Sequence, residues 1–160
     1  LPEPQIFGEA TRVMSLRDGM KKMSKSDPSD YSRINLMDST DEIAQKIKKA
    51  KTDSNPLPDS PEQLENRPEA LNLLGIYAAL SDSDLDNTCK KFSGKLFSDF
   101  KNELADLVVS VLGPISDEMR RMKKDENFIN QILKNGSEKA TEVAEENLQE
   151  IKKIVGFFTP

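Results

Sequence analysis

The sequence predicts a mainly α-helical protein: a helical bundle preceded by a short strand and a lysine-rich loop. Three observations support this fold class. Apolar residues recur at helical spacing from about residue 40 onward. A capping-box pattern, with Ser39 followed three residues later by Glu42, precedes the first of these runs. Hydrophobic residues make up 36% of the chain, which suffices for the core of a soluble domain.

The first 38 residues have little helical pattern. Residues 1–7 contain two prolines, which favour an extended approach segment. Residues 11–16 read as a short strand. Residues 17–30 are rich in Lys, Ser and turn formers and predict a loop. Residues 33–37 are expected to be extended again, with Ile34 and Leu36 on one side.

Helices follow in order. Ile43, Ile47 and Ala50 share one face and predict a helix over residues 40–51. Residues 52–67 contain three prolines and are expected to form a linker. Pro68 suits a first helical position. The helix after it is apolar on most sides, so it is expected at the centre of the core.

The second half of the chain continues the helical pattern. Residues 85–92 predict a short helix. A long apolar stripe runs from Phe97 to Met122, and Pro114 is expected to interrupt or kink that helix. A further helix includes residues 128–133 and is expected to stop at Gly136. The last predicted helix covers residues 140–155.

Composition excludes several classes of enzyme and several locations. The 160 residues fit one domain, or one domain plus an appendage. The chain has no His, which excludes Ser/His/Asp and Cys/His catalysis and His metal clusters. Its seven glycines form neither a dinucleotide fingerprint nor a Walker motif. A single cysteine, Cys89, excludes an internal disulfide; we expect it to be buried. No metal-site pattern, membrane span or signal peptide is present, so a cytoplasmic location is expected.

Charge is unevenly distributed. The formal charge is −5, from 23 basic and 28 acidic residues. An acidic total argues against indiscriminate nucleic-acid binding, but it leaves open a local basic face that reads one RNA. The chain begins with Leu1 rather than Met, and we therefore expect a piece of a longer protein.

The segment that can carry chemistry is the loop from Lys21 to Asp27. Lys22 and Lys25 lie three residues apart, with hydroxyl side chains beside them. Two ammonium groups, hydroxyls and loop amides can together hold a polyphosphate. From charge alone, a solvated surface loop is the other interpretation.

The exact sequence of residues 22–26 favours the phosphate-binding interpretation over a solvated loop. Residues 22–26 read Lys-Met-Ser-Lys-Ser, the KMSKS signature of class I aminoacyl-tRNA synthetases. The surroundings resemble the tryptophanyl-tRNA synthetase family of the bacterial type, and tyrosyl enzymes fit less well. The similar stretches cover nearly the whole chain: residues 12–19, 27–29, 43–53, 67–80 and 154–157.

The resemblance implies an activity, substrates and site residues. The family activates tryptophan with ATP, which Mg²⁺ accompanies, and transfers it to tRNA(Trp). Lys22 and Lys25 would be the catalytic residues, holding the β- and γ-phosphates. The ATP-binding residues it implies are Val13, through its backbone at the adenine, together with Lys22, Met23, Ser24, Lys25 and Ser26.

The resemblance also implies a division of the chain. Residues 1–38 would be the C-terminal end of the catalytic domain, a remnant edge of its α/β Rossmann-like sheet. Residues 39–160 would form the helical domain that binds the tRNA anticodon. The family's His-containing signature and tryptophan pocket are absent, so we expect a C-terminal portion that is inactive alone, from a parent that is a homodimer.

Candidate tRNA contacts come from clusters of basic residues, although surface lysines are usually only solvated. The preferred cluster follows Pro114: Arg120, Arg121, Lys123 and Lys124. Two further clusters are residues 46–51 and 90–95. Two alternatives stay open at this point: a free-standing helical tRNA-binding module without catalysis, and a helical bundle that binds a protein partner.

Overall fold

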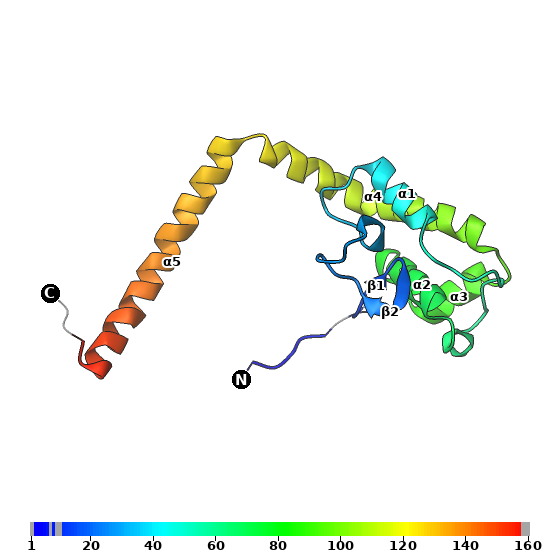
Figure 1. Ribbon diagram of the computed structural model, residues 1–160, viewed down its shortest axis with the longest axis horizontal. Helices are drawn as coiled ribbons and strands as arrows, with labels where there is room; N and C mark the ends of the chain where they lie inside the picture. Colours follow the sequence, from blue (N-terminus) through cyan, green and yellow to red (C-terminus); the bar gives the residue numbers. More distant parts are fainter. Residues whose placement is uncertain (1, 7, 9–10, 158–160) are drawn as a thin grey trace. The chain divides into compact units, whose positions relative to one another are not determined.

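The computed structural model describes residues 2–6, 8 and 11–157 (Figure 1). It is mainly α-helical with one short β-hairpin, which confirms the predicted fold class. The chain divides into two compact units, residues 1–117 and 118–160, and each is described by itself. The functional division predicted at residue 38 is a different one and stays a prediction. Within the predicted extended segment 1–7, residues 1 and 7 lie outside the described part.

A β-hairpin opens the first unit. Strand β1 (Met14–Ser15) pairs antiparallel with β2 (Asp18–Lys22), with Met14 opposite Lys22 and an irregularity before Ser15. The expected loop over residues 17–30 was therefore wrong in its first part. The sequence of β2 has no apolar alternation, so a period-2 pattern could not reveal it. The strand exists because it pairs with β1 and packs on a helix.

A short 3-10 helix, η1 (Asp30–Ser32), follows the lysine-rich loop. The expectation of an extended segment over residues 33–37 holds for Arg33, whose φ is −143° and ψ is 164°. It was wrong further on, because the Asp38 amide donates to the Asn35 carbonyl at 3.0 Å and closes a turn.

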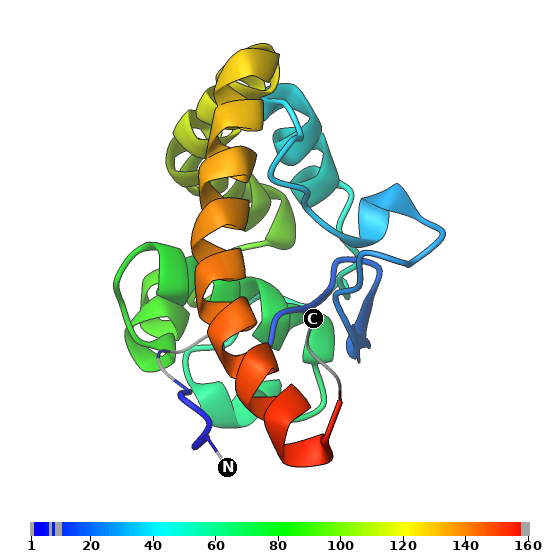
Figure 2. The ribbon, with the colours of Figure 1, turned by 90° about the vertical axis from the view of Figure 1, so that its left-hand side faces the viewer.

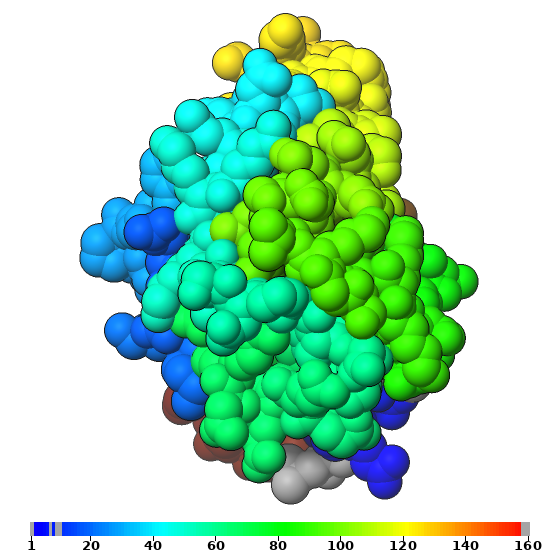
Figure 3. Space-filling model, turned by 90° about the vertical axis from the view of Figure 1, so that its right-hand side faces the viewer, coloured from blue at the N-terminus to red at the C-terminus, as the bar shows by residue number. Residues whose placement is uncertain are grey.

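Helix α1 (Thr40–Lys48) begins at the predicted capping box. The Ser39 hydroxyl accepts a hydrogen bond from the Glu42 amide at 3.3 Å, and the Glu42 carboxylate accepts from the Ser39 amide at 2.7 Å. The linker that follows contains a 3-10 helix, η2 (Pro61–Leu64). Figure 3 shows the linker lying against the segment just before the helix that begins at Phe97. There the Leu57 amide donates to the Lys95 carbonyl, and the Leu57 carbonyl accepts from the Gly94 amide.

Helices α2 (Pro68–Leu80) and α3 (Leu85–Phe92) form the centre of the first unit. Helix α2 buries seven residues, and no single face is polar, as expected of a central helix. Tyr77, Phe92 and Phe100 meet edge to face or tilted, with ring centroids 4.8 to 6.0 Å apart. Cys89 is fully buried among these helices, as predicted, and burial raises the pKa of its thiol.

Helix α4 (Phe97–Lys123) is a single helix, and Pro114 does not end it. Residues on both sides of Pro114 make contacts within the first unit that fit a continuous helix. Gly113 is buried, and a Cβ there would lie 3.4 Å from the Thr40 side chain. The Ser116 hydroxyl donates to the Leu112 carbonyl at 3.0 Å. The residues of the predicted apolar stripe, on both sides of the proline, therefore lie on one helix.

Helix α5 (Glu126–Val155) belongs to the second unit and is unbroken (Figure 2). The expected stop at Gly136 and the division into two helices were wrong. A glycine ends a helix only where it turns left-handed, as Gly156 does with φ 75°, whereas Gly136 keeps a helical conformation. The Asp125 carboxylate caps the start by accepting from the Phe128 amide at 3.0 Å. No helix of the described residues is apolar over enough length to cross a bilayer.

Candidate functional site: the lysine loop and its hairpin

The lysine-rich loop grows directly out of the hairpin. The Met23 amide donates to the Val13 carbonyl at 3.1 Å, which continues the pairing one step beyond β2. The Met23 side chain packs against the hydrophobic core. Val13 and Met23 therefore fix the position at which the chain leaves the sheet, and Lys22 lies at that exit with its side chain exposed.

The next residues form a compact turn. The Asp27 amide donates to the Ser24 carbonyl at 3.4 Å, and the Ser26 amide donates to the Ser24 hydroxyl at 3.3 Å. The two serine hydroxyls lie 3.0 Å apart. Lys25, between them, is exposed. The turn thus presents a lysine and two hydroxyls to the outside, a set of donors suited to phosphate oxygens.

An open hollow lies beside the loop on the hairpin. Its volume is about 620 Å³, and it is lined by Thr11, Arg12, Val13, Lys22 and Met23. Three predicted site residues, Val13, Lys22 and Met23, therefore meet at one surface. The other three, Ser24, Lys25 and Ser26, form the adjoining turn. Arg12 adds a second cation that the sequence did not single out as a site residue, because only its place in the fold brings it to Lys22.

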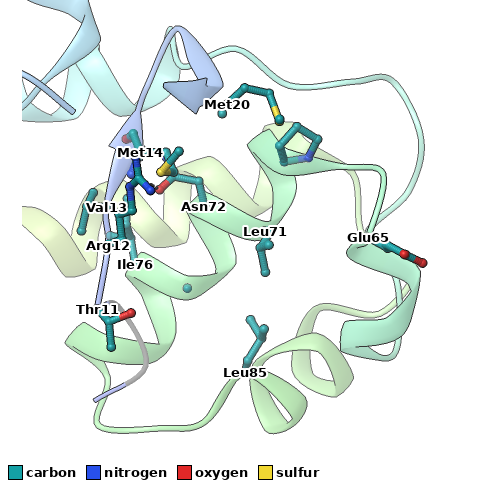
Figure 4. Close-up of a pocket in the computed structure, with 13 residues that line it drawn as sticks. Thr11, Arg12, Val13, Met14, Met20, Glu65, Leu71, Asn72, Ile76 and Leu85 are labelled. Atoms are coloured by element: carbon teal, nitrogen blue, oxygen red, sulfur yellow. Dashed lines mark hydrogen bonds between the residues drawn. The ribbon is translucent and has the colours of Figure 1, made fainter. Parts of the chain in front are cut away.

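A second hollow of about 390 Å³ lies where the hairpin meets helices α2 and α3 (Figure 4). Met14, Leu71 and Leu85 line it, and Asn72 enters it from α2. Asn72 is also the link between helix and strand, since its amide hydrogen-bonds both the amide and the carbonyl of Met14. Thr11, Arg12 and Val13 line both hollows, so the two hollows adjoin along this segment.

The predicted tRNA cluster lies in the second unit, at the turn between α4 and α5. Arg121 makes two hydrogen bonds to the Glu118 carboxylate, at 2.7 and 2.6 Å. These bonds lower the pKa of Glu118 and raise that of Arg121. Arg121 and Lys124 line an open surface together with residues 125–127, two of which are acidic. The charge of Arg121 is thus already neutralised within the chain.

Among the described residues, no three His, Cys, Asp or Glu side chains come close enough together to hold a metal ion. The exposed part of the KMSKS turn instead presents lysines and serine hydroxyls. This arrangement can bind an anion such as a polyphosphate, whose charge the lysines offset.

The geometry, a hairpin that ends in a KMSKS turn in front of a helical bundle, defines a class of protein. The family model described as "tRNA synthetases class I (W and Y)" matches residues 2–113. The chain therefore belongs to this family of class I aminoacyl-tRNA synthetases.

Comparison with individual proteins gives a narrower result than the family model. The chain is 57% identical over 155 residues to a protein named "Tryptophan--tRNA ligase" of Rhizobium meliloti, covering 97% of this chain and 44% of that protein. It is 55% identical over 157 residues to the protein of the same name of Brucella melitensis, covering 98% and 44%. The chain thus spans less than half the length of these relatives. The crystal structure of tryptophanyl-tRNA synthetase from Mycoplasma pneumoniae matches with a TM-score of 0.74 and 26% identity, covering 94% of this chain and 45% of that one.

Proposed function

We propose that the chain is the C-terminal portion of a tryptophan--tRNA ligase, the part that carries the KMSKS loop and the helical domain. The observation that carries the proposal is the KMSKS turn itself, seated on the hairpin beside Arg12 and Val13. The identity of more than half of all residues to ligases of that name supports it.

The reaction would begin with activation of tryptophan. A carboxylate oxygen of tryptophan attacks the α-phosphorus of ATP, and the bond from that phosphorus to the oxygen bridging to the β-phosphate breaks. Negative charge then builds on the departing pyrophosphate. Lys22 and Lys25 would stabilise that charge, and Ser24 and Ser26 would support them by donating hydrogen bonds. The Met23 backbone would support them by its hydrogen bond to Val13, which fixes the start of the turn. Mg²⁺ would arrive bound to ATP.

The adenine would lie along the hairpin. In this proposal the Val13 backbone contacts the adenine ring, and the hollow that Val13 shares with Lys22 leads from base to phosphates. The residues that bind tryptophan would belong to the portion of the ligase outside this chain. The chain alone would therefore neither activate tryptophan nor form the adenylate.

The helical residues would bind tRNA(Trp), with residues 39–160 as the anticodon-binding domain and residues 1–38 as part of the catalytic domain. Arg120, Arg121, Lys123 and Lys124 are the proposed contacts to the RNA backbone. The intact ligase would act in the cytoplasm as a homodimer.

Two experiments test the proposal. The first measures tryptophan-dependent exchange of labelled pyrophosphate into ATP, in the intact ligase and in this chain alone. Activity in the intact protein and none in the chain is expected; activity in the chain alone would contradict the proposed division. A Lys25→Met variant of the ligase should lose most of the exchange, because one of the two cations that stabilise pyrophosphate is gone.

The second experiment asks whether the helical residues recognise tRNA(Trp) without the rest of the ligase. Binding of this chain to tRNA(Trp) is compared with binding to the same tRNA with a replaced anticodon, at one fixed salt concentration. Preference for tRNA(Trp) would show that the helical domain reads the anticodon without its catalytic partner. Equal binding of both would show that recognition requires the intact ligase.

A further inference from the structure

The side chain of Arg33 contacts the segment that leaves the KMSKS turn, which Tyr31 and Ser32 also hold through hydrogen bonds. The Nη1 of Arg33 donates to the Asp27 carbonyl at 2.8 Å and to the Ser29 carbonyl at 3.4 Å. Its Nε donates to the Asn35 side chain at 3.1 Å, and its Nη2 pairs with Asp30 at 3.0 Å. The guanidinium therefore uses all three of its nitrogens, and Asp27 is the residue directly after the KMSKS string.

A buried lysine connects this arrangement to helix α1. Lys46 is 4% exposed, and its ammonium lies 2.7 Å from Asp30 and 2.6 Å from Asp38. Asp38 is 7% exposed. A lysine so deeply buried must keep its carboxylate partners, because an unpaired charge inside a protein is strongly unfavourable. The position of Asp30 is therefore tied to the position of α1.

Asn35 closes the network. Its side-chain amide donates to Asp30 at 3.0 Å and to Asp38 at 3.2 Å, and its backbone amide donates to Asp38 at 2.8 Å. Arg33 and Lys46 contribute two positive charges, and the two aspartates contribute two negative charges. The network is thus internally neutral, and its cations are committed to carboxylates and carbonyls of the chain rather than to an outside anion.

We propose that Arg33 is a positioning residue for the KMSKS turn, which it ties to helix α1 through Asp30 and Lys46, so that Lys25 is held where it can meet the phosphates of ATP. This inference rests on the proposed function, because it assigns the anchored turn a role in ATP binding. Arg33 acts through the carbonyl of Asp27 and does not line the hollow at Lys22. A planar guanidinium is needed, since a lysine ammonium cannot reach this spread of acceptors at once.

The chain contains a matched control, Arg67. Its guanidinium is bidentate to Asp53, at 2.9 and 2.8 Å, and donates to the carbonyls of Pro56 and Asn55 at 2.9 and 3.2 Å. The Arg67 side chain is 16% exposed, against 17% for Arg33. Arg67→Lys therefore removes a similar set of contacts in the linker, away from the KMSKS turn.

The first test measures motion of the turn in this chain. In Arg33→Lys, the NMR order parameters of the Ser26, Asp27 and Ser29 amides are expected to fall from values of a rigid backbone, about 0.85, to below about 0.6. The same amides should be unchanged in Arg67→Lys. If Arg33→Lys does not fold, Asp30→Asn replaces it, because that exposed carboxylate links Arg33 to Lys46 while Lys46 keeps Asp38.

The second test measures catalysis in the intact ligase. Arg33→Lys should raise the KM for ATP in pyrophosphate exchange by about tenfold, because a misplaced lysine loses alignment with the phosphates. The KM for tryptophan and all constants of Arg67→Lys should stay within about twofold of the unsubstituted values, since neither depends on the turn.

The outcomes are distinguishable. Unchanged order parameters in Arg33→Lys, or equal loosening in Arg67→Lys, would overturn the anchoring. A loosened turn with an unchanged KM for ATP would overturn the role in positioning Lys25. Absence of tryptophan-dependent exchange from the unsubstituted ligase would instead defeat the proposed function, and the order parameters would still decide whether Arg33 anchors the turn.

Discussion

The side-chain amide of Asn72 satisfies both backbone polar groups of Met14. Its Oδ1 accepts from the Met14 amide at 2.8 Å, and its Nδ2 donates to the Met14 carbonyl at 2.9 Å. Asn72 lies on α2 and Met14 on β1, so a helix side chain here takes the place of a neighbouring strand. These two hydrogen bonds hold strand β1, which directly follows Val13.

Replacing Asn72 should loosen the hairpin. In Asn72→Leu both groups of Met14 lose their partner, and we expect a loss of about 2 kcal/mol in the free energy of unfolding, measured by urea titration. Asn55→Ala is the control, because Asn55 is exposed and its hydrogen bonds to Asp53 and Arg67 are made by its backbone. A loss in Asn72→Leu no larger than in the control would contradict the role given to Asn72.

Substitution of glycine by alanine is expected to change the stability of the protein in opposite directions at two positions of the first unit. A Cβ on Gly19 would lie 2.5 Å from the Pro68 carbonyl carbon and 2.6 Å from the Glu69 nitrogen. Gly19→Ala should therefore destabilise the protein by about 2 kcal/mol or more, because backbone atoms of α2 must move.

Gly75 lies within α2, and a methyl group on it would meet no atom within 4 Å apart from the helix backbone around it. Gly75→Ala should stabilise the protein by about 0.5 to 1 kcal/mol, since alanine is the better helix former. Thermal unfolding followed by circular dichroism measures both changes. A Gly19→Ala variant as stable as the unsubstituted chain would show that the close approach of β2 to α2 is wrong, and a destabilised Gly75→Ala variant would contradict the free space at Gly75.

Local features of the sequence were the predictable ones. The capping box of Ser39 and Glu42 depends on residues three apart, and the structure has it as predicted. The KMSKS string is likewise local, and its turn is closed by bonds among residues 24–27. Strand β2 was missed because its partner and the helix beneath it supply the reason for its conformation. Gly136 was misread because its neighbours, and not its own preference, keep it helical.

The anchoring network could not be predicted from the sequence for the same reason. Lys46 was grouped with Lys48 and Lys49 as a candidate RNA contact, but it is buried against Asp30 and Asp38. Its partners lie 16 and 8 residues away, at spacings that no helix or strand pattern connects. Only the turn at residues 35–38 brings them together.

The Lys46 network gives stability a defined pH dependence. Hydrogen bonds from Lys46 and then Asn35 lower the pKa of Asp30 below 3.8. Burial lowers the pKa of Lys46, but its hydrogen bonds to Asp30 and Asp38 outweigh burial and leave that pKa above 10.5. The Asp30 contribution is therefore present above pH 3.8 and is lost as pH falls through its folded pKa. The Lys46 contribution is present below pH 10.5 and is lost at higher pH.

Urea midpoints measured across acid pH test this assignment. The unsubstituted chain should lose stability below pH 3.8, and Asp30→Asn should lose less over the same range, since it has no carboxylate to protonate there. Asn55→Ala is a suitable control, because it removes no carboxylate and Asn55 lies outside the network. An acid dependence in Asp30→Asn identical to that of the unsubstituted chain would show that Asp30 makes no such contribution.

The proposed tRNA contacts make a prediction about salt. If Lys123 and Lys124 each contact a phosphate, Lys123→Ala and Lys124→Ala should each weaken tRNA binding and lower the slope of log affinity against log salt by about 1. Glu118→Gln should act in the opposite direction, because it releases Arg121 from the carboxylate that now neutralises it. Lys134→Ala is the control within the same unit, since Lys134 pairs with Glu138 along α5. The three variants and the control are compared in filter binding to tRNA(Trp) over a salt series, and equal slopes in all of them would place the RNA on another of the basic clusters.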